Sequence, residues 1–65
     1  MVEVGERIEF LGHGAYDPDP LTVGEKGTVN WVGAEFQGHA QIGVAWDSGR
    51  TLGLIDGVDR YRVLR

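Results

Sequence analysis

The chain has 65 residues, the size of one small domain with a modest core, and no cysteine, which excludes disulfide bonds, thiolate metal sites and thiol chemistry. Its net charge is −4, but residues 1–49 hold two basic side chains against eight acidic ones, whereas residues 50–65 hold four against two. The acidic majority argues against broad binding to a phosphate backbone, which needs clustered Lys and Arg.

The first half of the chain contains two expected strands separated by a long loop. Residues 7–11 alternate, with Ile8 and Phe10 predicted to point inward. The loop over residues 12–23 contains Asp-Pro-Asp-Pro, and because each proline fixes its own φ we expect this loop to be rigid and extended. A turn over residues 24–27 then leads into a second strand, residues 27–32.

The clearest pattern in the chain follows an expected loop over residues 33–39. Ile42, Val44 and Trp46 alternate before an Asp-Ser-Gly turn, and Leu52 and Leu54 alternate after it, which predicts a tight antiparallel hairpin. Residues 56–59 indicate one irregular or 3₁₀ turn, and residues 61–64 a fifth strand. Eleven glycines interrupt every window long enough for a helix. We therefore expect a single all-β domain over residues 1–65, a small five-stranded SH3-like barrel.

Four segments in a fixed order resemble a known family. They are Asp-Pro-Asp-Pro at 17–20, Gly-Glu-Lys-Gly-Thr-Val at 24–29, Val-Ala-Trp-Asp-Ser-Gly-Arg-Thr-Leu at 44–52 and Gly-Val-Asp-Arg-Tyr-Arg-Val at 57–63. Together they resemble the DUF4314 family of bacteria, notably actinobacteria, and of their phages and mobile elements, over residues 5–64. The resemblance implies a small β-barrel with no established activity, so it assigns no catalytic residue.

A more distant similarity concerns the hairpin alone. Its Val-x-Trp-Asp-x-Gly sequence, residues 44–49, is similar to the SH3-like repeats of large eukaryotic ubiquitin ligases. That similarity suggests that such a hairpin can serve peptide binding. The chain lacks the tryptophan-rich loop of those repeats, so no ligand is transferred from them.

Aromatic side chains supply the main candidates for a binding face. Trp31 shares the parity of Val29 and would point inward, but it also lies where the second strand runs out into a loop, so both orientations stay open. With Tyr16 and Phe36 from the loops it would form an aromatic groove for a proline-rich helix or a methylated ammonium group. Trp46 has the parity of core residues, yet it is close enough to the turn to join this face.

The acidic loop adds a second element to the candidate face. Asp17 and Asp19 would contact a basic partner, or they would simply be solvated charges on a rigid turn. Two carboxylates are too few for calcium, which takes six or more oxygen ligands. His13 and His39 lie in loops without partners at ligand spacing, and no acid–base pair is evident, so we expect no metal, no cofactor and no enzymatic activity.

The leading hypothesis is a non-enzymatic binding or adaptor module for a protein or peptide partner. Its face would combine aromatic burial with acidic contacts to a cationic segment, using Tyr16, Asp17, Asp19, Trp31, Phe36 and Trp46. One alternative is a nucleotide or nucleic-acid binder that uses Arg50, Arg60 and Arg62, unless these arginines pair with nearby acids. Another is a structural component that assembles with copies of itself through its edge strands. Because no apolar run approaches the roughly 20 residues that span a bilayer, and no signal peptide is evident, we expect a cytoplasmic location.

Overall fold

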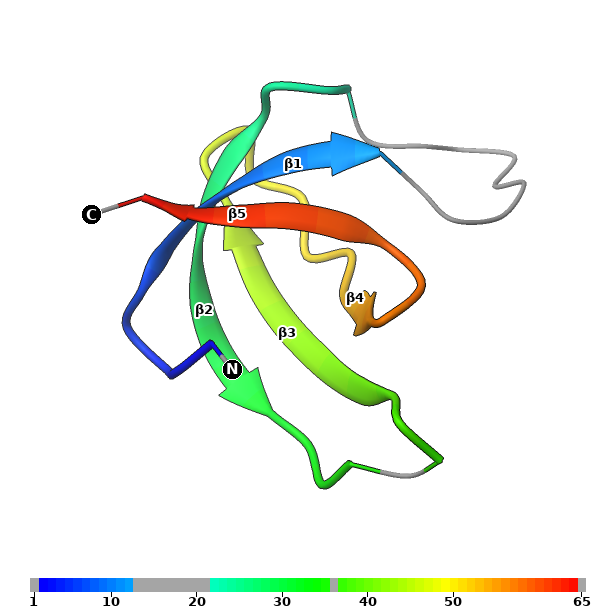
Figure 1. Cartoon of the computed structure of the whole chain (residues 1–65). Helices are drawn as coiled ribbons and strands as arrows, with labels where there is room; N and C mark the ends of the chain where they lie inside the picture. The colour runs from blue at the N-terminus through cyan, green and yellow to red at the C-terminus, as the bar shows by residue number, and fades with distance from the viewer. Residues whose placement is uncertain (1, 13–21, 36, 65) are drawn as a thin grey trace.

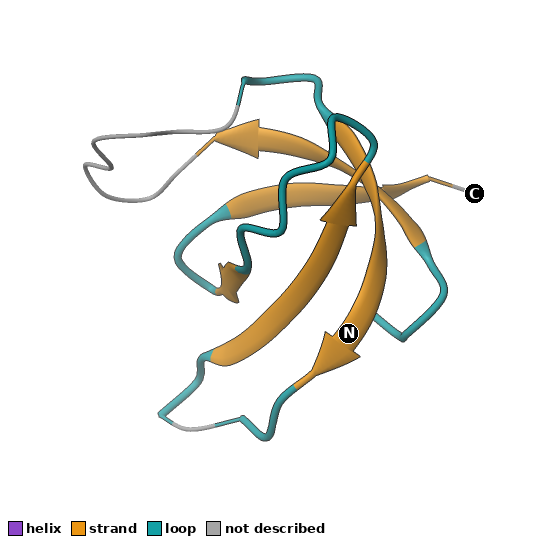
Figure 2. Cartoon of the chain, turned by 180° about the vertical axis from the view of Figure 1, so that it is seen from behind, coloured by secondary structure: helices purple, strands orange, loops and turns teal. Residues whose placement is uncertain are grey.

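A computed structural model of the chain describes residues 2–12, 22–35 and 37–64, which form one antiparallel sheet of five strands (Figure 1). The strands are β1 (Arg7–Gly12), β2 (Lys26–Val32), β3 (Ala40–Trp46), β4 (Leu54–Asp56) and β5 (Arg60–Leu64). Their order is β4-β3-β2-β1-β5, so β4 and β5 are the edges of a curved sheet that does not close. Loops and turns within residues 47–53 and 57–59 connect β3 to β4 and β4 to β5 (Figure 2). The described residues include no helix of the length and apolarity needed to cross a membrane. The prediction of an all-β, five-stranded fold is confirmed.

The core is built from alternate positions of the strands, as the period of two predicts. Phe10 of β1 and Trp46 of β3 meet edge to face, with ring centroids 6.2 Å apart and planes at 83°. Such a pair adds to the burial of the two rings themselves. The described core cluster consists of Val2, Ile8, Phe10, Val29, Ile42, Val44, Trp46 and Leu54.

The tight hairpin predicted for residues 41–55 forms only at its two ends. At the turn, the Gly49 N–H donates to the Trp46 carbonyl at 2.9 Å, and the Trp46 N–H donates to the Arg50 carbonyl at 3.0 Å. Pairing resumes at Ile42 and Leu54, so β4 begins two residues later than the alternation predicts. The Leu52 carbonyl instead accepts the Trp46 Nε1–H at 2.6 Å. A buried indole needs such an acceptor, and supplying it draws this segment out of the ladder.

A bulge in β2 decides the orientation of Trp31. Val29 pairs with Val44, but Trp31 pairs with Gly43, so Asn30 is an additional residue on β2. An additional residue reverses the alternation beyond it. Trp31 therefore faces solvent, with 53% of its surface exposed, although it shares the sequence parity of the buried Val29.

The β4 edge is capped by the turn that follows it. The Ile55 N–H donates to the Asp59 carboxylate, Oδ2, at 2.8 Å. The Ile55 carbonyl accepts the N–H groups of Val58 and Asp59 at 3.1 and 2.8 Å. Because both backbone groups of Ile55 are bonded within the chain, this point of the edge is closed to a strand from another molecule.

Tyr61 of β5 gives the fold a dependence on high pH. Its hydroxyl donates to Asp56 Oδ1 at 3.2 Å, and burial, followed by the charge and hydrogen bond of Asp56, raises the pKa of Tyr61 to about 12. The unfolded phenol has a pKa of about 10, so the neutral form stabilises the fold fully below pH ~10, and this contribution is lost as the pH rises towards ~12. We expect urea unfolding of Tyr61→Phe to depend less on pH in this window than that of the wild type. The tyrosinate absorbance that is present in the wild type and missing in Tyr61→Phe reports the ionisation of Tyr61. If its midpoint lay near the ordinary tyrosine pKa of about 10, the raised pKa of Tyr61 would be contradicted.

Candidate functional site

Trp31 is held in place by two glycines. A Cβ on Gly33 would lie 2.7 Å from Cη2 of the indole, and a Cβ on Gly43 would lie 3.1 Å from the Cβ of Trp31. The indole therefore lies against Gly33 and the Cβ of Trp31 against Gly43, while more than half of the residue stays exposed. The bulge at Asn30 and these two glycines together present a fixed aromatic surface on the outer face of the sheet.

Two shallow depressions flank this indole, and they share Trp31, Gln41 and Ile55 as a common wall. The first, about 370 Å³, is bounded by the loop between β2 and β3 and includes the polar side chains of Gln37 and His39. The second, about 320 Å³, is lined by no charged side chain, and its lining is completed by Ile42, Gly43, Gly53 and Leu54. The two depressions thus differ in their side chains: Gln37 and His39 line the first, and the aliphatic Ile42 and Leu54 line the second.

The described residues that line the two depressions include no Lys or Arg, and three carboxylates lie next to this lining. Glu35 follows Ala34 and Asp56 follows Ile55 in the sequence, and the Asp59 carboxylate accepts the Ile55 N–H. Glu35 is exposed, and its carboxylate makes no ion pair or hydrogen bond with another described residue. The side chain of His39 points to the β4 end, where its Nδ1 lies 3.2 Å from the Asp56 carbonyl oxygen. The surface around Trp31 therefore favours a cation over an anion.

The predicted binding face is only partly described by the structure. Tyr16, Asp17, Asp19 and Phe36 lie outside the described residues. Trp46 is 3% exposed and packs on Phe10, so its assignment to an exposed partner face is wrong, and the core interpretation of this residue is correct. The reason is the unbroken alternation of β3, which places Trp46 on the same side as Ile42.

Sequence reasoning missed the residues that complete the surface around Trp31. Gly33 and Gly43 support the indole, and Ile55 and Gln41 form the wall between the depressions. One signal was available, because a glycine inside an alternating strand often marks a bulge or a close approach. Gly43 occupies such a position in β3.

The three arginines of the alternative anion site lie in different surroundings. Arg62 of β5 forms an ion pair with Glu9 of β1, with Nη2 2.5 Å from Oε1. The guanidinium of Arg60 approaches β1, where a Cβ on Gly12 would lie 3.1 Å from its Nη2. Arg50 follows the β3 turn and lines a third depression beside Glu25. The acidic neighbours of Arg62 and Arg50 reduce the positive potential that an anion would meet.

The described residues contain no group of three or more His, Cys, Asp or Glu side chains positioned for a metal. The carboxylate of Asp47 accepts two hydrogen bonds from Arg7, at 2.6 and 2.7 Å. The Arg7 guanidinium lowers the pKa of Asp47. Asp47 is therefore held ionised at neutral pH, where it connects the β3 turn to β1 and has no proton to donate.

Comparison with known proteins identifies the family of the chain. No curated protein and no solved structure matches it. A family model described as "Domain of unknown function (DUF4314)" matches residues 4–64, nearly the whole chain. The resemblance found in the four sequence segments is thus confirmed, and the chain belongs to the DUF4314 family.

Proposed function

We propose that the protein is a non-enzymatic, SH3-like binding or adaptor module that acts in the cytoplasm and holds a protein or peptide partner on the surface around Trp31. The observation that carries this proposal is an indole that is 53% exposed and yet supported by Gly33 and Gly43. A fixed, exposed tryptophan loses little conformational entropy when a partner covers it, and tryptophan is enriched among the residues that dominate binding energy.

The surroundings of Trp31 favour a protein partner over a nucleic acid. A single-stranded nucleic acid would stack a base on the indole but also needs positive charge along its backbone. The walls of the two depressions contain no Lys or Arg. Self-assembly through β4 is disfavoured too, because the backbone groups of Ile55 are bonded to the turn over residues 56–59.

Trp31→Ala should abolish partner binding and leave the fold intact. Panning a phage-displayed library of random peptides on the wild-type protein should yield clones that bind Trp31→Ala at least about tenfold more weakly. The free energy of unfolding should change by about 1 kcal/mol or less, because the removed ring is half exposed.

Val23→Ala is the matched control for this experiment. Val23 is also exposed, at 64%, but it lies in the turn before β2 and lines the third depression. The selected clones should bind Val23→Ala as they bind the wild type. If no clone distinguishes the wild type from Trp31→Ala, the proposed function is wrong.

A further inference from the structure

Resting on the proposed function, we propose that the partner is an extended segment that crosses the outer face of the sheet and presents a Lys or Arg side chain next to an apolar one. The cation stacks on Trp31 at the first depression. The apolar side chain fills the second depression, between Trp31 and the β4 residues Leu54 and Ile55.

The capped edge excludes one mode of docking. A segment that added to the sheet as a further strand beside β4 would need the backbone N–H and carbonyl of Ile55. Both groups are already bonded, to the Asp59 carboxylate and to the N–H groups of Val58 and Asp59. The partner must therefore lie on the face of the sheet, and its side chains, not its backbone, make the specific contacts.

Charge complementarity selects the cation. No Lys or Arg is among the described residues that line the two depressions, whereas three carboxylates adjoin the lining: Glu35 and Asp56 in the sequence, and Asp59 through its hydrogen bond with Ile55. The nearest basic residue on β2, Lys26, precedes Trp31 by five positions, roughly 16 Å along a strand. A Lys or Arg placed over the exposed indole gains cation–π attraction together with the field of these carboxylates.

The second depression selects the apolar neighbour. Gly43 and Gly53 leave its floor without side chains, and the flanking residues are Ile42, Leu54 and Ile55. Nothing in its lining is charged, so an apolar side chain can enter it without desolvating a charged group. Because the two depressions share the wall of Trp31, Gln41 and Ile55, side chains on one side of an extended segment, two positions apart, reach both.

The test uses peptides selected on the wild-type protein and then synthesised. The selected sequences should share one Lys or Arg two positions from an apolar residue. Replacing the cation by Gln should weaken binding roughly 3- to 30-fold, and replacing the apolar residue by Asn should do the same. Added salt should weaken the binding of the parent peptide more than that of its Gln variant.

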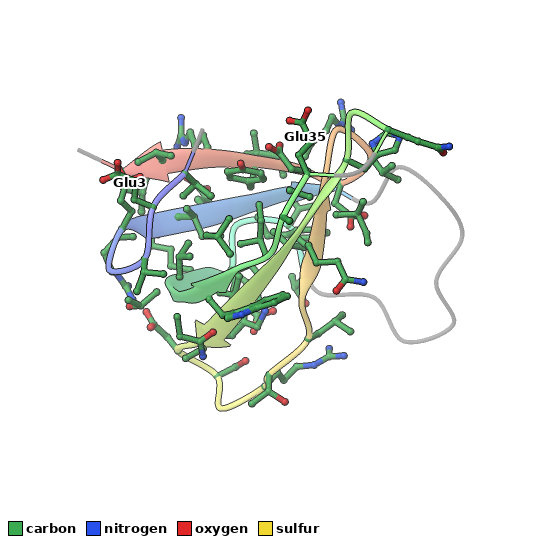
Figure 3. The ribbon with its side chains drawn as sticks, turned by 90° about the horizontal axis from the view of Figure 1, so that it is seen from below. Glu3 and Glu35 are labelled. Atoms are coloured by element: carbon green, nitrogen blue, oxygen red, sulfur yellow. The ribbon has the colours of Figure 1, made fainter. Side chains whose placement is uncertain are left out.

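A pair of acidic residues provides the matched protein variants. Glu35 and Glu3 are both exposed, their carboxylates lack a described partner, and they lie well apart (Figure 3). Glu35→Gln should weaken binding of the parent peptide about 2- to 5-fold, whereas Glu3→Gln should leave it unchanged.

The outcomes separate this inference from the proposed function. Trp31-dependent peptides that are neutral or acidic would overturn the inference and leave the proposed function standing, as would equal effects of Glu35→Gln and Glu3→Gln. Self-association of the protein that disappears in Trp31→Ala would also overturn it, because a second copy would then be the occupant. If an oligothymidylate displaced the peptide at physiological salt, the inference would likewise be overturned, because a nucleic acid would then be the occupant of this surface.

Discussion

Phe10→Ala is expected to destabilise the protein by about 3 to 5 kcal/mol, the usual cost of removing a phenyl ring from a core that cannot collapse around the gap. Phe10 is 1% exposed, and its ring packs edge to face on Trp46, so the variant loses both its own burial and this contact. A domain of this size has a total stability of only about 3 to 10 kcal/mol. The melting temperature should therefore fall by about 15 °C or more, and a large unfolded fraction is expected at 37 °C.

Leu11→Ala is the control for this core substitution. Leu11 is the next residue on β1, but it points to the outer side and is 37% exposed. Its truncation should cost about 1 kcal/mol or less. Thermal and urea unfolding followed by tryptophan fluorescence and circular dichroism would measure both variants. Similar losses for Phe10→Ala and Leu11→Ala would contradict the inward–outward assignment of β1.

The sequence is most informative where alternation runs without interruption. On β1 and β3, Ile8, Phe10, Ile42 and Val44 follow the period of two, and all four are buried as predicted. In such strands local geometry alone decides which side chains meet the core. The pairing of Ile42 with Leu54 has the register that the turn at Trp46 and Arg50 sets.

Prediction fails where one local event overrides the alternation. The bulge at Asn30 turns Trp31 outward, and whether a strand bulges depends on what the neighbouring strand offers at that position. Here the neighbour offers Gly43, whose missing side chain admits both Asn30 and Trp31. The candidate site thus arises from a pairing between β2 and β3 that neither segment specifies alone.

The opening of the β3–β4 ladder has a similar origin. Alternation predicts a strand from Leu52, but the indole N–H of Trp46 takes the Leu52 carbonyl as its acceptor. The requirement that a buried donor be satisfied is general, while the choice of acceptor depends on the tertiary structure. The hydrogen bond from the Ile55 N–H to the Asp59 carboxylate is also set by tertiary structure. It closes the β4 edge at Ile55, so that this edge does not compete with the surface around Trp31 for a partner.

Gly27→Ala should cost about 1 to 3 kcal/mol, although replacing glycine by alanine in a strand often stabilises it. Gly27 is buried on β2, and a Cβ there would lie 2.7 Å from Val44 Cγ1, 2.9 Å from the Ala45 carbonyl oxygen and 3.0 Å from Trp46 Cα. Two of these three atoms belong to the backbone of β3, so the steric clash can be relieved only if β2 and β3 move apart. Urea unfolding should show a lower midpoint with an unchanged slope.

Gly43→Ala separates strand spacing from the support of Trp31. The nearest atom to its added Cβ is Asn30 Oδ1 at 2.7 Å, the end of an exposed and movable side chain, followed by Trp31 Cβ at 3.1 Å. This variant should lose less stability than Gly27→Ala, because Asn30 can rotate away, yet it should weaken peptide binding because the indole must shift. Gly27→Ala protein that remains folded should bind more nearly like the wild type. Gly43 would space the strands, and would not position Trp31, if Gly43→Ala lost more stability than Gly27→Ala. The same conclusion would follow if Gly27→Ala weakened peptide binding more than Gly43→Ala.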